Sequence, residues 1–258
     1  MKKLERNFIL EYLKNDIEKN QYVNAMWECG ASSFGRIDEW SDIDIIIDIE
    51  DGKTIEVFQD IDKIVENISP VERSYGCPQR MSKGAYQKVY KLKDQSEFLL
   101  IEICAVQNSS NQKFLQEEIH GKGKIHFDKK SITSTSPLDK DKLSKKLKSR
   151  IYELENIFNI YQNLPKKEMN RGNNIEALAF YRNFSLYPLV EMLRIKYDPY
   201  RYDFRTRYLY YNFPEDTVKK LEELFFISDS KDLKDKHEIC INWFNNLYNE
   251  LKEKRSYL

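Results

Sequence analysis

The stretch from Trp27 to Asp48 constrains the fold of this chain most. It opens with a segment bounded by Gly30 and Gly35 and ends in a run where aspartates alternate with isoleucines. Alternation with a period of two is typical of a β-strand, so Asp42 and Asp44 are expected on the same side of one strand. Two carboxylates held that close repel each other. Folds tolerate such a pair when a cation lies between the two or one of them is protonated.

The glycine segment predicts an anion-binding turn. Between its two glycines it carries Ala31, Ser32, Ser33 and Phe34, which are mostly small or polar. Small residues let backbone N–H groups approach an anion closely. A phosphate-binding turn ahead of a carboxylate pair indicates a site for a magnesium-bound nucleotide. The alternative is an ordinary turn followed by an edge strand with solvated acids.

The spacing of these residues resembles the active-site motif of the polymerase-β-like nucleotidyltransferase superfamily. That motif is a Gly-Ser pair, a spacer of about ten residues, and Asp-x-Asp on a strand. Here Gly30 and Ala31 precede the segment from Ser32 to Ser41, and Asp42-Ile43-Asp44 follows. The second glycine, Gly35, and the serine before the first aspartate also stand where many members of the family have them.

The resemblance implies a role for each residue of this motif, with one departure. Ala31 stands where the family has a serine whose hydroxyl helps to hold the terminal phosphates. Either Ser32 replaces that hydroxyl, the backbone suffices, or activity is weakened. Asp42 and Asp44 are expected to hold Mg²⁺. The residues expected to bind the nucleotide are Gly30, Ala31, Ser32, Gly35, Arg36 and Ser41; an Arg36–Asp38 pair that fixes the turn is the alternative for Arg36.

A third acid is expected from Glu102. It is the one charge in the apolar segment from Phe98 to Val106, which predicts a central strand. A carboxylate inside a buried strand is costly unless something compensates it. In the resembling family, a third acid from a neighbouring strand is either a metal ligand or the base that accepts the proton of the acceptor hydroxyl. The alternative is a Glu102 paired with a buried lysine or arginine.

The N-terminal half predicts strands and helices around this motif. Apolar residues recur at steps of three and four in its two longer expected helices, and its other elements are expected to be strands and one short helix. The segment 71–84 shows no period and is expected to be an irregular loop, with Arg73, Arg80 and Lys83 either solvated or near a triphosphate. The expected elements are helix 3–19, strand 22–29, strand 42–50, helix 54–68, strand 86–93, strand 98–106 and a short helix 114–119.

The C-terminal half predicts helices alone. The polar run 131–142, with Pro137, is the expected boundary between two domains. Helices are expected near 143–161, 174–196 with a kink at Pro188, and 232–254, with another beginning at Pro214. The tyrosine- and arginine-rich segment 197–214 is expected to pack the helical domain onto its neighbour, with stacking on bases or sugar rings as the alternative. The fold class is therefore α+β, with a nucleotidyltransferase domain over 1–136, built on a mixed sheet flanked by helices, and a helical domain over 137–258.

Composition excludes several classes. Lys plus Arg and Asp plus Glu are 42 each, so the net charge is zero and gives no electrostatic case for a nucleic-acid partner. No apolar run reaches the roughly 18 residues needed to span a bilayer, and the charged start is unlike a signal peptide. The four scattered cysteines show no zinc-ligand spacing and are expected to be reduced. The cytoplasm is therefore the expected location, for a monomer or homodimer without a membrane contact.

The expected function follows from the resemblance to antibiotic nucleotidyltransferases that modify aminoglycosides, streptomycin and lincosamides. It is Mg²⁺-dependent transfer of AMP from ATP, or of another nucleoside monophosphate, to a hydroxyl of such a small molecule, which confers antibiotic resistance. One alternative is the same transfer to a protein or RNA by an antitoxin-like enzyme. The other is a nucleotide-binding sensor without catalysis, which the Ala31 departure makes conceivable.

Overall fold

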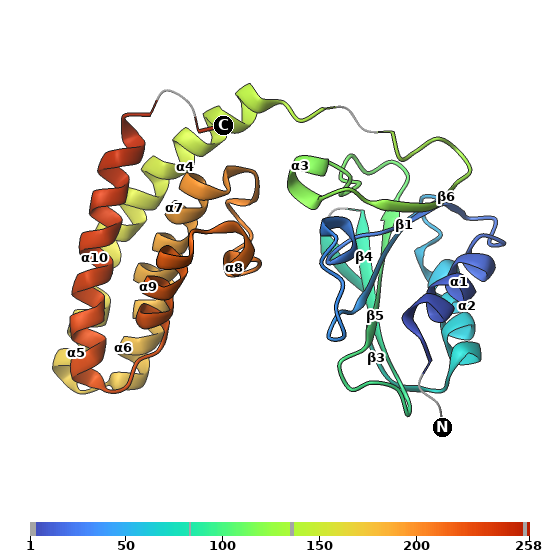
Figure 1. The fold of residues 1–258 in the computed structure, drawn as a ribbon, viewed down its shortest axis with the longest axis horizontal. Coiled ribbons are helices and arrows are strands. Elements are labelled where there is room, and N and C mark those ends of the chain that lie inside the picture. The colour runs from blue at the N-terminus through green and yellow to red at the C-terminus, as the bar shows by residue number, and fades with distance from the viewer. Residues whose placement is uncertain (1–3, 83, 135–136, 255–256) are drawn as a thin grey trace. The chain divides into compact units, whose positions relative to one another are not determined.

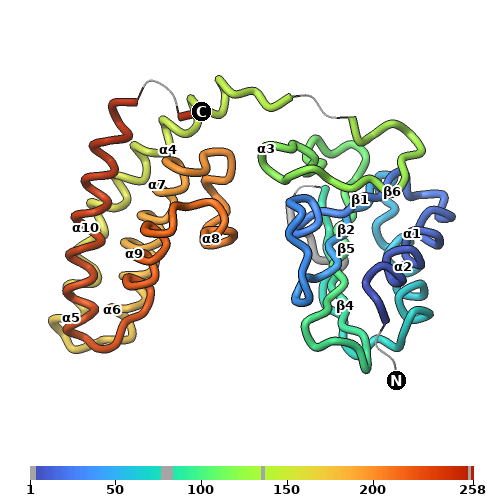
Figure 2. Tube along the Cα trace, viewed as in Figure 1, coloured from blue at the N-terminus to red at the C-terminus, as the bar shows by residue number. Residues whose placement is uncertain are grey.

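A computed structural model of the protein describes residues 4–82, 84–134, 137–254 and 257–258. The chain forms two compact units, Met1–Leu138 and Asp139–Leu258. The first contains a sheet with helices and the second contains helices, as the ribbon and the trace show (Figures 1 and 2). The predicted α+β class, a mixed sheet with a helical C-terminal part, is confirmed.

The first unit is built on a six-stranded sheet with the strand order β3-β4-β5-β2-β1-β6. Its β2 and β5 pair in parallel, and the other neighbouring strands pair antiparallel. The two parallel strands lie at the centre of the sheet, where apolar side chains are most needed. The strands are β1 (Val23–Glu28), β2 (Ile43–Ile49), β3 (Val71–Ser82), β4 (Ala85–Leu92), β5 (Leu100–Gln107) and β6 (Lys124–Asp128).

The two faces of this sheet differ. Helices α1 (Arg6–Ile17) and α2 (Thr54–Ile68) pack on one face (Figure 1). On that face, Ile43, Ile45 and Ile47 of β2 belong to the main core. The opposite face has a smaller apolar cluster that includes Trp27, Ile46 and Cys104, with Phe114 and Leu115 packed against it. Because side chains alternate along a strand, the acids of β2 lie on this second face.

The expectation of an irregular loop over 71–84 is wrong. Val71–Ser82 is the edge strand β3, which pairs with β4 through a register that shifts on both sides of Gly76. Such irregular pairing displaces side chains from strict alternation, which hides the strand from a periodicity argument. Of the three basic residues singled out there, Lys83 and the side chain of Arg80 lie outside the described part of the chain.

The second unit consists of helices around one apolar core. The expected helix over 174–196 is interrupted, because a π-helical turn separates α6 from α7. Pro188 lies at the start of α7 and has no N–H to donate to the Phe184 carbonyl four residues earlier. That carbonyl accepts instead from Gln162 Nε2 at 2.8 Å. The helices are α4 (Lys140–Tyr161), α5 (Asn163–Arg171), α6 (Asn174–Tyr181), η2 (Arg182–Leu186), α7 (Tyr187–Tyr197), η3 (Pro199–Arg201), α8 (Leu209–Asn212), α9 (Glu215–Phe225) and α10 (Ser230–Lys252).

The tyrosine- and arginine-rich segment packs within the second unit. Tyr202, Leu209 and Phe213 belong to its core. The buried guanidinium of Arg194 donates to the backbone carbonyls of Arg205 and Arg207 and to Asp198. These contacts give the segment a structural role within the second unit.

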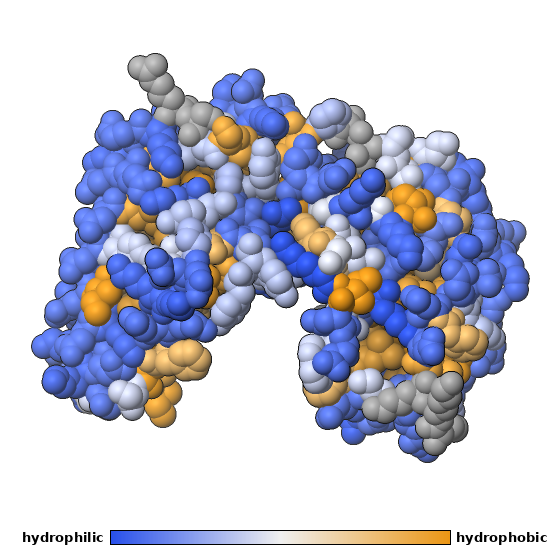
Figure 3. All heavy atoms as spheres, in the orientation of Figure 1, coloured by the Kyte–Doolittle hydropathy of each residue, from blue (hydrophilic) through white to orange (hydrophobic). Residues whose placement is uncertain are grey.

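The surface agrees with the composition. A third of the residues are charged, and the face drawn in Figure 3 is mostly hydrophilic with separate apolar patches. No helix in the part of the chain that the structure describes is long and apolar enough to cross a membrane.

Candidate active site

Asp44 and Glu102 form the centre of the candidate site. They stand directly opposite each other in the parallel pairing of β2 and β5. Paired residues on neighbouring strands lie about 5 Å apart and project to the same side, so both carboxylates leave the face away from α1 and α2. Both side chains are partly exposed. Glu102 therefore lies on the strand next to that of Asp44, and its role as a third acid of the site stays a prediction.

Gly30, at the start of the glycine turn, lies against the side chain of Asp44. Its φ is +61°, and a Cβ atom built at this position would lie 1.9 Å from Oδ2 of Asp44. The neighbouring Cys29 N–H donates to the Asp44 carbonyl at 3.0 Å. Any side chain at residue 30 would therefore displace the carboxylate, which explains why a glycine stands here.

Two thiols lie beside the carboxylates. Burial raises the pKa of the Cys29 thiol far above its ordinary value, and the negative charges of Asp44 and Glu102 raise it further. Burial and then the charge of Glu102 raise the pKa of Cys104 to about 12. Both thiols therefore stay protonated near neutral pH and are poor nucleophiles.

Asp42 lies just before β2, which begins at Ile43 and not at residue 42 as expected. Its Oδ1 accepts a hydrogen bond from the Leu100 N–H at 3.0 Å. The bond joins the beginning of β2 to the beginning of β5. Asp42 therefore holds together the two strands that carry Asp44 and Glu102.

The glycine turn contains one short helical element. Ser32–Phe34 is a 3₁₀ turn, and Gly35 ends it in the left-handed conformation. The Arg36 guanidinium lies over the Phe34 ring, 5.1 Å from its centroid. The backbone between the two glycines is therefore helical for a single turn.

The chain that follows α3 (Glu117–His120) contacts this turn through a backbone hydrogen bond. The Lys122 N–H donates to the Ser33 carbonyl at 3.0 Å, and a Cβ at Gly121 would lie 2.6 Å from that same oxygen. The sequence alone did not predict this contact. Its only signal is a glycine after a short helix, which does not reveal a partner so far away along the chain.

Ser41 closes a second turn. Its hydroxyl donates to Asp38 Oδ1 at 2.7 Å and accepts from the Asp38 N–H at 2.9 Å. The same Asp38 oxygen accepts from the Trp40 N–H at 3.1 Å. Asp38 thus fixes the turn through Ser41 and Trp40, and a role for Ser41 in nucleotide binding stays a prediction.

The acids fit a divalent ion that the phosphates of a bound nucleotide also help to hold. Among the described residues, no three or more His, Cys, Asp and Glu side chains form a group that could hold a metal ion by themselves. Mg²⁺ in nucleotide-dependent enzymes is usually held by one or two carboxylates together with phosphates and water. The Asp44 and Glu102 pair supplies that number of hard oxygen donors, with Gly30 leaving room beside them. Binding of Mg²⁺ by Asp42, Asp44 and Glu102 stays a prediction.

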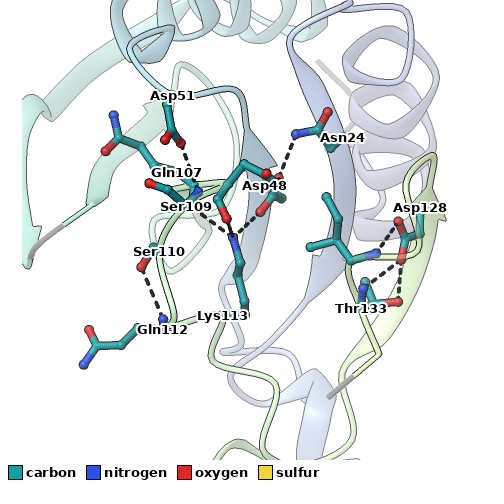
Figure 4. Close-up of polar contacts among 12 residues, drawn as sticks. Asn24, Asp48, Asp51, Gln107, Ser109, Ser110, Gln112, Lys113, Asp128 and Thr133 are labelled. Carbon is teal, nitrogen blue, oxygen red and sulfur yellow. Dashed lines mark hydrogen bonds and ion pairs between the residues drawn. The ribbon is translucent and has the colours of Figure 1, made fainter. Parts of the chain in front are cut away.

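A buried ion pair supports the same face of the sheet, and the sequence analysis did not single it out. Asp48, whose side chain is fully buried, lies 2.5 Å from Lys113 Nζ and accepts from the amides of Asn24 and Asn108 (Figure 4). Lys113 also donates to the carbonyls of Gln107 and Asn108. The signal was the spacing, because residues 44, 46 and 48 share one face of a strand.

Comparisons with known proteins were made at three levels. No protein-family model and no curated protein matches the sequence. Among solved structures, the chain is similar to an aminoglycoside 6-adenyltransferase from Bacillus subtilis, with 11% identity, a TM-score of 0.39, and coverage of 97% of this chain and 91% of that one. It is also similar to a spectinomycin adenyltransferase from Enterococcus faecialis, solved with ATP and spectinomycin, with 10% identity, a TM-score of 0.35, and coverage of 96% and 100%.

Proposed function

We propose that this chain is a Mg²⁺-dependent nucleotidyltransferase. It transfers a nucleoside monophosphate, AMP from ATP, to a hydroxyl of a small molecule such as an aminoglycoside or lincosamide antibiotic. The observation that carries the proposal is the meeting of three features at one edge of the sheet. The Gly30 turn closes on Asp44, Glu102 stands opposite Asp44, and Asp42 ties their two strands together.

The glycine turn binds the departing phosphates. Backbone N–H groups between Gly30 and Gly35, the Ser32 hydroxyl and the Arg36 guanidinium are the donors available for the β- and γ-phosphates. Ala31 offers only its backbone N–H, so the neighbouring donors have to compensate for the hydroxyl that the superfamily motif usually has.

The acids bind the cation and handle the proton. Asp42 and Asp44 would hold Mg²⁺ together with the nucleotide phosphates, whose charge the ion would neutralise. Glu102 would either complete this metal site or act as the base. When the acceptor oxygen attacks the α-phosphorus and the bond to pyrophosphate breaks, the acceptor hydroxyl loses its proton. The Glu102 carboxylate is the base proposed to take that proton.

The test is transfer of label from α-labelled ATP to an acceptor in the presence of Mg²⁺. Asp42→Asn should abolish the transfer, because it removes the charge while its amide oxygen can still accept from the Leu100 N–H. Asp235→Asn, at an exposed position of α10, serves as the matched control and should retain the activity.

Two other outcomes would change the assignment. Label that appears on a co-purified protein or RNA, and on no small molecule, would make the acceptor macromolecular. Binding of ATP without pyrophosphate release for any acceptor would replace the enzyme by a nucleotide sensor.

A further inference from the structure

Two exposed aromatic side chains contact each other beside the candidate site. Trp40 is 57% exposed and Phe98 is 48% exposed. Their ring centroids lie 4.8 Å apart at an interplanar angle of 87°, an edge-to-face contact. Single exposed apolar side chains are common on protein surfaces, whereas two exposed rings in contact form an apolar patch that a ligand can cover.

The backbone fixes both rings in place. The Trp40 N–H donates to Asp38 at 3.1 Å, and the Phe98 N–H donates to Ser96 Oγ at 3.4 Å. The Asp42 to Leu100 hydrogen bond then joins the two segments two residues beyond each ring. A surface that is already ordered loses little conformational entropy when a ligand binds to it.

The sheet order separates this aromatic pair from the glycine turn. Gly30 follows β1, whereas Phe98 precedes β5, and β2 with Asp44 lies between those two strands. In phosphoryl-type transfer, the attacking and leaving oxygens lie roughly in line on opposite sides of the phosphorus. With pyrophosphate at the glycine turn, the acceptor has to approach from the β5 side, where the aromatic pair lies.

The charge around the pair favours a cationic ligand. The segments 37–42 and 94–99 contain no lysine or arginine. Their acids include Glu39 and Glu97, which are exposed and directly adjoin the two aromatic residues. Carboxylates and ring faces attract ammonium and guanidinium groups and repel nucleotide phosphates.

We propose that Trp40 and Phe98 form the acceptor-binding surface, and that it selects acceptors whose saturated ring carries ammonium or guanidinium groups. The ring lies against the aromatic pair while Glu39 and Glu97 attract its positive charges. This proposal rests on the proposed function, because it takes the glycine turn to be the pyrophosphate side.

The first experiment measures binding without turnover. Calorimetric titration with streptomycin and spectinomycin, in the absence of ATP, compares the unaltered chain with Trp40→Ala and Phe98→Ala. Each variant should bind at least tenfold more weakly, and Trp40→Phe should recover part of the loss. Phe8→Ala is the control, because Phe8 is 52% exposed on α1, on the other face of the sheet. It should bind as the unaltered chain does.

The second experiment tests which of the two substrates the aromatic pair binds, and whether the charges of Glu39 and Glu97 contribute to that binding. In the transfer assay, Trp40→Ala should raise the KM for the antibiotic at least tenfold and leave the KM for ATP and the melting temperature unchanged. The double variant Glu39→Gln with Glu97→Gln should weaken binding of streptomycin more at low salt than at high salt, and trehalose, an uncharged ring, should bind weakly to both proteins.

The outcomes distinguish this proposal from the proposed function. Trp40-dependent binding without any transfer would keep the binding surface and reject the enzyme. Transfer with unchanged binding in both alanine variants would keep the enzyme and reject the binding surface. A rise in the KM for ATP alone would assign the pair to the nucleotide and also reject the proposal, as would the failure of every ring compound to bind.

Discussion

At the scale of single residues, Gly30 has little freedom to change, because its missing side chain leaves the space that the Asp44 carboxylate fills. We expect Gly30→Ala to lower nucleotidyl transfer by about 10²-fold or more, since a displacement of about 1 Å in a catalytic group has that effect. Gly52→Ala is the matched control. Gly52 also has a positive φ, +78°, but a Cβ there meets nothing within 4 Å.

The two glycine variants separate strain from collision. Both should lose about 1–2 kcal/mol of stability, measured by urea denaturation, because alanine disfavours the left-handed conformation. Only Gly30→Ala should also lose nucleotidyl-transfer activity. Equal activity in the two variants would show that the position of Asp44 is not critical.

Glu102 has either a chemical or a structural role, and one substitution distinguishes them. We expect Glu102→Gln to lower transfer by about 10²–10⁴-fold, the usual contribution of a general base, with an unchanged melting temperature. Glu117→Gln, at an exposed position of α3, is the control. A collapse of folding in Glu102→Gln would instead indicate that its charge compensates a buried partner.

The spacing of the aspartates in the sequence predicted the acids of the site, but not the hydrogen bonds that hold the segments around them. The alternation of residues 42, 44 and 48 was visible, but the hydrogen bond from Leu100 to Asp42 spans 58 positions of the chain. The hydrogen bond from the Lys122 N–H to the Ser33 carbonyl joins residues that are even farther apart in the sequence. Contacts of this kind depend on strand order, which local patterns do not contain.

At the scale of elements, the Asp48–Lys113 pair links β2 to the segment that follows β5. We expect Lys113→Met to cost about 3–5 kcal/mol of unfolding free energy, since it leaves the buried Asp48 charge uncompensated. The double variant Asp48→Asn with Lys113→Met should cost less than Lys113→Met alone. Urea denaturation of the single and double variants measures this coupling, and strictly additive effects would contradict it.

Elements with a regular apolar period were predicted well. Helix α2 occupies the expected residues 54–68, because its apolar stripe has to face the sheet. Strand β3 was missed because its register shifts remove the alternation. Helix α5 was not predicted. The partner of the Phe184 carbonyl, which Pro188 leaves without a donor, is Gln162, and this contact between distant residues is visible only in the structure.

At the scale of the whole molecule, each unit buries a different ionisable group. In the helical unit, burial and then the charge of Lys166 lower the pKa of His237 to about 4. In the sheet unit, burial opposes the ionisation of Glu28. Hydrogen bonds from His126 and Arg6, the charge of Arg6 and a hydrogen bond from Lys124 outweigh burial and lower its pKa to about 2.

These shifts predict two separate acid transitions. An unfolded histidine takes up a proton below its ordinary pKa of 6.5, so the stability from neutral His237 is complete above pH 6.5 and is lost as the pH falls toward 4. The stability from ionised Glu28 is complete above its ordinary pKa of 4.5 and is lost as the pH falls toward 2. The helical unit should therefore weaken first.

Hydrogen exchange resolved by peptide over this pH range measures the two units within the intact chain. His237→Gln should remove about 2–3 kcal/mol of the pH dependence of the helical unit between pH 6.5 and 4, and leave that of the sheet unit unchanged. Loss of protection in both units at the same pH would contradict the prediction.

The sequence by itself determined the α+β class, the alternating acids of β2 and the glycine that precedes them. These follow from local periodicity and from the steric limits on single residues. Only the tertiary structure decided that Glu102 stands beside Asp44, that Gly30 lies against Asp44, and that Trp40 contacts Phe98. Strand order and register bring distant residues together, and both result from packing the whole sheet against its helices rather than from any short segment.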